Sequence, residues 1–171
     1  MTPHPTSPDD PFDILGIEPG YRLEPALLER RWLALSAQLH PDRARDPAEA
    51  AARLATVNRA REVLGNPESR ADALLVRLGG PTRDQHRVLP EGFLLGMMDI
   101  RERAEEARVG HDPAARSEVE RWAIDQRRAY DERIGAMFES LGPSPDIETL
   151  RAIRVELNGW RYIERMIEQL D

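Results

Sequence analysis

The stretch "QLHPDR", residues 38–43, places an imidazole and a carboxylate two positions apart at the end of an apolar-periodic run. Three interpretations fit His40 and Asp42. They form a catalytic base with its orienting acid, they mark a helix end at which Pro41 stops the helix, or they belong to a tripeptide that a partner protein binds. The catalytic interpretation is the weakest, because Asp42 is poorly placed to orient the imidazole and no Ser or Cys nucleophile with a supporting motif accompanies the pair. The tripeptide alone does not separate the other two.

Composition excludes several classes of function. The chain has 171 residues and a net charge of -7, which argues against nucleic-acid binding. It has no Cys, and its four His show no metal-ligand spacing, so we predict no metal and no cofactor. No apolar run approaches ~18 residues, which predicts no membrane span. Prolines stand where a signal peptide would need an apolar stretch, so a cytoplasmic location is expected.

The first half of the chain carries a helical pattern from residue 11 onwards. Residues 1–10 are rich in proline and lack apolar periodicity, which predicts a disordered tail. After "PFDILG" come two long segments with apolar residues three and four positions apart, as on one helix face. These stripes are Leu28, Trp32, Leu35 and Leu39, then Ala51, Leu54, Val57, Ala60 or Arg61, and Leu64. Because the loop between them is short, the two helices are expected to pack antiparallel, followed by a short helix up to residue 78.

The second half is predicted to be a separate helical domain. The Gly-Gly-Pro and polar residues of 79–89 predict a linker, and 90–171 predict three helices joined by short loops, which make a three-helix bundle. Asp146 is the expected N-cap of the last helix. The expected core stripe of the middle helix is Val119, Trp122, Gln126, Ala129, Arg133, Met137 and Leu141. No segment shows the alternation of a strand, so the fold class is all-α.

The first bundle helix carries more apolar residues than one core face needs. Its core stripe is Phe93, Met97, Ile100, Ala104 and Ala107. Three further apolar residues share a side with three carboxylates; they are Leu94, Leu95 and Met98, beside Asp99, Glu102 and Glu106. Apolar anchors beside a charged rim favour a partner-binding face. The alternatives are a helix that is buried more broadly and a solvated acidic face; a carboxylate metal site is disfavoured because no His lies nearby.

Two sets of motifs carry a resemblance to a known family. Residues 10–78 resemble a J domain through "DPFDILGI", "HPDR" and "VNRAREVLGNPESRADALL". In the second half, "FLLGMMDIRERAEEA" and "WRYIERM" resemble segments of HscB-type J-domain co-chaperones of iron-sulfur cluster assembly. The expected fold is therefore an N-terminal J domain over 11–78, an antiparallel helical hairpin with short flanking helices, and a C-terminal three-helix scaffold-binding domain over 90–171.

The resemblance implies an adaptor and not an enzyme. Such a co-chaperone stimulates the ATPase of a DnaK/HscA-type chaperone and delivers an IscU-type iron-sulfur scaffold protein to it; the alternative is a J-domain co-chaperone for a different client. The implied chaperone-binding residues are His40, Pro41, Asp42, Arg43 and Arg31. The implied scaffold-binding residues are Leu94, Leu95, Met98, Asp99, Glu102, Glu106 and Tyr162. The chain departs from the family at "LSAQL", where J domains carry cations before the tripeptide.

Overall fold

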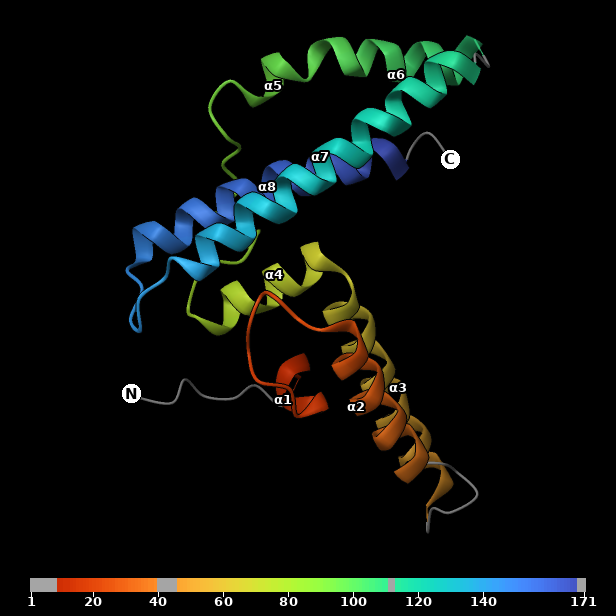
Figure 1. Cartoon of the computed structure of the whole chain (residues 1–171), viewed down its shortest axis with the longest axis vertical. Coiled ribbons are helices and arrows are strands. Elements are labelled where there is room, and N and C mark those ends of the chain that lie inside the picture. Colours follow the sequence, from red (N-terminus) through yellow and green to blue (C-terminus); the bar gives the residue numbers. More distant parts are fainter. Residues whose placement is uncertain (1–8, 40–45, 111–112, 169–171) are drawn as a thin grey trace. The chain divides into compact units, whose positions relative to one another are not determined.

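A computed structural model describes residues 9–39, 46–110 and 113–168, without the side chain of Arg108 (Figure 1). Within these ranges every regular element is a helix, as the sequence predicted. The chain divides into two compact units, Met1–Gly80 and Pro81–Asp171. None of the described helices combines the length and the apolar character needed to cross a bilayer.

The first unit begins with a short helix that is fixed at both ends. In α1 (Pro11–Leu15) the Asp10 carboxylate caps the helix by accepting a hydrogen bond of 2.9 Å from the amide of Phe12. Gly16 ends it in the left-handed region, at φ 61°, which a side chain would disfavour. The "FDILG" motif is thereby explained: Phe12 and Leu15 are fully buried, and Gly16 turns the chain away behind them.

The helices α2 (Pro25–Gln38) and α3 (Pro47–Gly65) form the predicted antiparallel hairpin (Figure 1). The residues that these two helices bury are aliphatic: Leu28, Ala50, Val57, Ala60 and Leu64. Outside this core, the Arg61 guanidinium lies 4.2 Å from the centre of the Trp32 ring, and the indole Nε1 donates a 2.8 Å hydrogen bond to Asn58 Oδ1. The hairpin is therefore held by its buried core and by the contacts of Trp32 with Arg61 and Asn58.

The helix α4 (Pro67–Arg77) closes the first unit. Asn66 ends α3 and also caps α4, because its Oδ1 accepts a 3.0 Å hydrogen bond from the amide of Ser69. At the other end of α4, Arg77 reaches back to α1 and makes ion pairs of 2.7 Å with Asp10 and 3.0 Å with Asp13. The hydrogen bond to Asp13 raises the pKa of Arg77 although burial lowers it, so the last turn of α4 is tied to the start of the unit.

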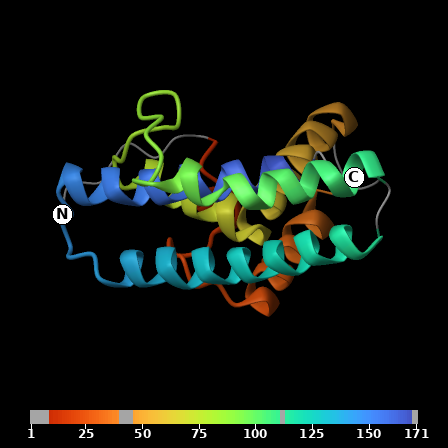
Figure 2. The same cartoon turned by 90° about the horizontal axis from the view of Figure 1, so that it is seen from above.

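The second unit consists of α5 (Phe93–Gly96), α6 (Met98–Gly110), α7 (Pro113–Glu139) and α8 (Ile147–Glu168). In Figure 2, α6 and α7 run in opposite directions, and α7 packs against both α6 and α8. Only Met97 separates α5 from α6, and its backbone is right-handed helical at φ -89° and ψ -7°. The amide of Met97 also donates to the carbonyl of Phe93, so α5 and α6 continue one another. Asp146 caps α8 through the amide of Thr149 at 2.9 Å, as predicted.

The contact between α7 and α8 combines an aromatic stack with two ion pairs. Tyr130 and Trp160 stack with centroids 6.0 Å apart and planes 19° from parallel. Burial, followed by the charge of Glu156, raises the pKa of Tyr130 to about 12. Beside this stack, Arg133 of α7 forms an ion pair of 2.7 Å with Glu156 of α8. Arg127 donates hydrogen bonds from two of its nitrogens to the Glu164 carboxylate. This seam fixes α8 in direction and register.

Val119 is buried as expected, but the rest of the core stripe predicted on α7 was wrong in register. Arg133 is exposed, and the residues that α7 buries are Val119, Ala123, Tyr130, Ile134, Gly135 and Phe138. Most of the residues that α7 buries are spaced by four or seven and so form one face, which is rotated around the helix from the expected stripe because α7 packs against both α6 and α8.

Residues 81–89, expected to belong to a linker, lie against α8 in the second unit. Arg154 is fully buried, and its Nε donates a 2.8 Å hydrogen bond to the carbonyl of Pro81. Asn158 Nδ2 donates to the carbonyls of His86 and Val88, both at 2.9 Å. Buried polar side chains of α8 thus satisfy the backbone of this segment and hold it in place.

Candidate functional site

The His-Pro-Asp tripeptide follows α2 in the sequence. His40, Pro41, Asp42 and Arg43 lie outside the described residues, so their predicted role in chaperone binding stays a prediction. Their neighbours are described: α2 ends at Gln38, and α3 begins at Pro47 under an Asp46 cap.

The exposed face of α2 carries two arginines that pair with neither of the nearby acids Glu29 and Asp46. Arg30 and Arg31 are both exposed, and Arg31 lies off the apolar stripe as predicted. Glu29, the acid beside them, accepts two hydrogen bonds from Arg61 of α3, at 3.0 and 3.2 Å. Asp46 is likewise engaged, because its carboxylate caps α3 by accepting from the amide of Ala48 at 2.9 Å. Glu29 and Asp46, two of the acids near the tripeptide, are thus engaged by groups other than Arg30 and Arg31.

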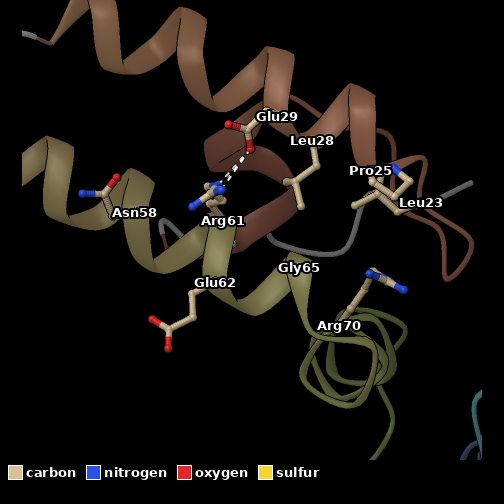
Figure 3. A pocket seen from close by; sticks show the side chains of 9 residues that line it. All are labelled: Leu23, Pro25, Leu28, Glu29, Asn58, Arg61, Glu62, Gly65 and Arg70. Carbon is tan, nitrogen blue, oxygen red and sulfur yellow. Dashed lines mark hydrogen bonds and ion pairs between the residues drawn. The ribbon is translucent and has the colours of Figure 1, made fainter.

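A groove of about 570 Å³ lies between the first turns of α2 and the end of α3 (Figure 3). Its lining residues are Leu23, Pro25, Leu28, Glu29, Asn58, Arg61, Glu62, Gly65 and Arg70. The charged groups that would hold a ligand there are already used: Arg61 pairs with Glu29, as Figure 3 shows, and Arg70 donates to the carbonyls of Tyr21 and Leu64. We therefore assign this groove to the packing of the hairpin.

The three apolar residues predicted for client contact are exposed. Leu94 is 54% exposed, Leu95 is 75% exposed and Met98 is 61% exposed, while Met97 beside them is buried. Within the second unit these three side chains are not covered by a neighbouring helix. We call Leu94, Leu95 and Met98 the apolar patch. Large apolar side chains that are exposed side by side in this way are typical of interaction surfaces.

The acidic residues beyond the apolar patch form one row. Leu94, Met98, Glu102 and Glu106 follow at spacings of four, and the helical backbone at Met97 keeps them on one side. Asp99, Glu102 and Glu106 are all exposed, and no described arginine forms an ion pair with them. Arg103, the nearest candidate partner on α6, pairs with Glu118 of α7 instead. We call these three residues the acidic row; its charge is left available to a partner.

Tyr162 borders the patch from another helix. It is half-buried on α8, and its ring meets that of Phe93 edge to face, with centroids 5.3 Å apart. Phe93 was expected only as the first residue of the core stripe, yet it is half-exposed and supports Tyr162 beside α5. Its place in a core-like spacing gave no signal of this second role. No three His, Asp or Glu side chains of the described part gather as metal ligands would.

Comparison with known proteins extends the resemblance. Residues 10–72 match the DnaJ domain family. A co-chaperone protein HscB homolog of Vibrio vulnificus is 30% identical over 153 residues, which cover 86% of this chain and 79% of that protein. The homolog of Vibrio atlanticus is 28% identical over 159 residues, covering 90% and 82% of the two chains. The crystal structure of human co-chaperone protein HscB has the same fold, with a TM-score of 0.77 and 24% identity over 99% of this chain and 83% of that one.

The chain belongs to the HscB family of J-domain co-chaperones. The expectations of an all-α fold and of a J domain at the N-terminus are thereby confirmed. A J domain in an HscB-type chain implies a partner chaperone of the Hsp70 kind.

Proposed function

We propose that this chain stimulates the ATPase of a DnaK/HscA-type chaperone and delivers an IscU-type iron-sulfur scaffold protein to it. The observation that carries the proposal is the exposed apolar patch beside an unpaired acidic row, in a chain whose first unit is a J domain. The chain itself performs no chemistry in this account; it joins two proteins.

The chaperone end of the adaptor is assigned to His40, Pro41, Asp42, Arg43 and Arg31. Proline has a fixed φ and no amide hydrogen, so Pro41 restrains the backbone beside the end of α2. The Asp42 carboxylate suits an arginine of the partner, since charge-assisted bidentate pairs are among the strong hydrogen bonds. Arg31 and Arg43 contribute mainly to the rate and orientation of encounter with an acidic surface. Stimulation follows if these contacts are stronger in the hydrolysis-competent state of the chaperone than in its other state.

The scaffold end is assigned to the apolar patch, the acidic row and Tyr162. The patch supplies side chains that a partner can bury, and full burial of each is worth about 1.5–3 kcal/mol. The acidic row then forms a charged rim that selects a partner with basic residues at matching positions. Because all of these residues lie in the second unit, the scaffold end is separate in sequence from the chaperone end.

Two single substitutions should separate the two ends. His40→Gln is expected to abolish stimulation of the chaperone ATPase and to leave scaffold binding unchanged. Leu95→Ser is expected to weaken scaffold binding by at least about tenfold, because it removes the most exposed apolar anchor, and to leave the basal stimulation of the ATPase intact. The measurements are steady-state ATPase rates and scaffold titration by calorimetry.

Ile124→Ser provides the matched control. Ile124 is also an exposed aliphatic residue of the second unit, at 57%, but it lies on α7 outside the patch, so its replacement should change neither readout. Retained ATPase stimulation in His40→Gln would end the adaptor account. A wild-type chain that stimulates the chaperone but binds no scaffold protein would favour the alternative, a J-domain co-chaperone for a different client.

A further inference from the structure

A second pocket, of about 400 Å³, opens in the second unit between α8 and the segment of residues 81–89. Its lining residues are Arg83, Asp84, Arg87, Leu89, Asn158, Arg161, Tyr162 and Arg165. We call it the arginine pocket. Four arginines face one aspartate there, in a chain whose net charge is -7, so positive charge is concentrated at this place against the trend of the whole molecule.

Internal ion pairs leave part of this positive charge free for a ligand. Arg87 pairs with Asp84 at 2.8 Å, but both side chains are largely exposed, where such a pair is worth little and exchanges easily. Arg161 pairs with Glu168 at 2.9 Å. Arg165 is exposed and forms no ion pair with any described residue.

The wall of the pocket is held in a fixed position by buried groups. Asn158 is 8% exposed and donates both amide hydrogens to the carbonyls of His86 and Val88, so residues 81–89 are anchored to α8. The arginines of the segment are thereby placed opposite those of the helix. Guanidinium groups converging on one recess suit a planar anion such as a carboxylate, which can accept two parallel hydrogen bonds from each.

Tyr162 connects the arginine pocket to the apolar patch. It lines the pocket, and the edge-to-face contact of its ring with Phe93, at 5.3 Å, places it beside α5, which carries Leu94 and Leu95. A protein that contacts both Tyr162 and the patch therefore borders the pocket as well. From the patch, the acidic row continues along α6, so such a protein meets the row as well.

We propose that the arginine pocket binds a carboxylate-bearing segment of the client scaffold protein. The inference rests on the proposed function, and it gives the client surface a definite chemistry: basic residues opposite the acidic row and an acidic segment opposite the pocket. Such a dipolar match fixes the orientation of the client on the second unit, because the reversed orientation places like charges together at both ends.

The test is scaffold binding by the full-length chain with two charges reversed. Arg87→Glu with Arg165→Glu should weaken binding by about tenfold at low salt and make it less sensitive to salt, since two exposed attractions become repulsions. The matched control is Arg128→Glu with Arg151→Glu. Arg151 pairs with Glu148 as Arg87 pairs with Asp84, and Arg128 is exposed without an ion pair to a described residue, as Arg165 is. The control has the same net charge and should bind as wild type.

Each outcome decides between the two proposals. If Leu95→Ser loses scaffold binding while the Arg87/Arg165 variant and its control bind equally, the pocket inference fails and the proposed function stands. If neither Leu95→Ser nor the arginine variant affects binding, the proposed function fails as well. A parallel titration with inorganic phosphate tests whether the pocket binds a small free anion instead. If the wild-type chain binds phosphate, the Arg87/Arg165 variant does not, and both bind the scaffold protein equally, the inference is overturned.

Discussion

At the scale of single residues, Glu164 shows how charge is used inside the second unit. Burial by itself would raise the pKa of this carboxyl, but hydrogen bonds from Arg127 and from the Trp160 indole outweigh burial, so its pKa is lowered. The indole contact is 3.0 Å and the closer arginine contact is 2.6 Å. The charged form of Glu164 is therefore the one that the folded state stabilises.

This arrangement predicts an acid-sensitive contribution to stability. Because the folded pKa lies below the ordinary value of 4.5, the stabilisation is present above that pH and is lost as pH falls through the folded pKa. Glu164→Gln should lower the free energy of unfolding at pH 7, and its deficit relative to wild type should shrink at pH 3.5. Urea unfolding at both pH values measures this.

Glu132→Gln is the matched control, since Glu132 is an exposed carboxylate of α7 that pairs with no described arginine. It should keep the wild-type dependence on pH. An equal deficit of Glu164→Gln at both pH values would show that its carboxylate contributes through shape and not through charge.

At the scale of elements, α8 organises the second unit because it approaches its neighbours closely at Gly159. A Cβ atom added there would lie 2.7 Å from the Tyr130 hydroxyl oxygen and 3.2 Å from Pro90 Cγ. The absence of a side chain thus lets α8 pack against both α7 and the segment that precedes α5.

Gly159→Ala should therefore destabilise the chain, although alanine favours helices by about 1 kcal/mol over glycine. The added methyl group must displace a stacked tyrosine, and overpacking of this kind costs about 1–3 kcal/mol. Gly96→Ala is the control, since nothing lies within 4 Å of the added Cβ there, and its stability should be equal to wild type or higher. Thermal unfolding compares the two; equal midpoints would contradict the close approach at Gly159.

The elements themselves could be predicted from the sequence, because apolar spacing, prolines and acidic caps are local signals. Leu28, Val57 and Leu64 were placed correctly in the core, and Asp146 was placed correctly as a cap. The buried face of α7 could not be predicted, because apolar residues lie on more than one side of this helix and the packing of α6 and α8 decides which side is covered.

The arginine pocket shows a second limit. Arg83 with Arg87 and Arg161 with Arg165 each follow the four-residue spacing, which was a visible signal in the sequence. Their convergence depends on two hydrogen bonds from Asn158 to backbone carbonyls about seventy positions away in the chain. The pairing of Glu29 of α2 with Arg61 of α3 is likewise a tertiary contact. Long-range contacts of this kind leave no periodic pattern along the sequence.

At the scale of the whole molecule, the two units carry different surfaces. The first presents exposed arginines on α2 before the His-Pro-Asp tripeptide, and the second presents the apolar patch, the acidic row and the arginine pocket. In the proposed adaptor, both surfaces lie in one chain, so a scaffold protein bound to the second unit has a high effective concentration at a chaperone bound to the first unit. The account therefore predicts that the two ends must be intact in the same molecule.

The most direct test is the rate of ATP hydrolysis by the chaperone with the scaffold protein and this chain present together. The wild-type chain should stimulate the rate synergistically, above the combined effects of the scaffold and the chain alone. An equimolar mixture of His40→Gln and Leu95→Ser supplies both intact ends on separate molecules, and the synergy should be absent. Full synergy from the mixture, or a merely additive rate with the wild-type chain, would contradict the adaptor account.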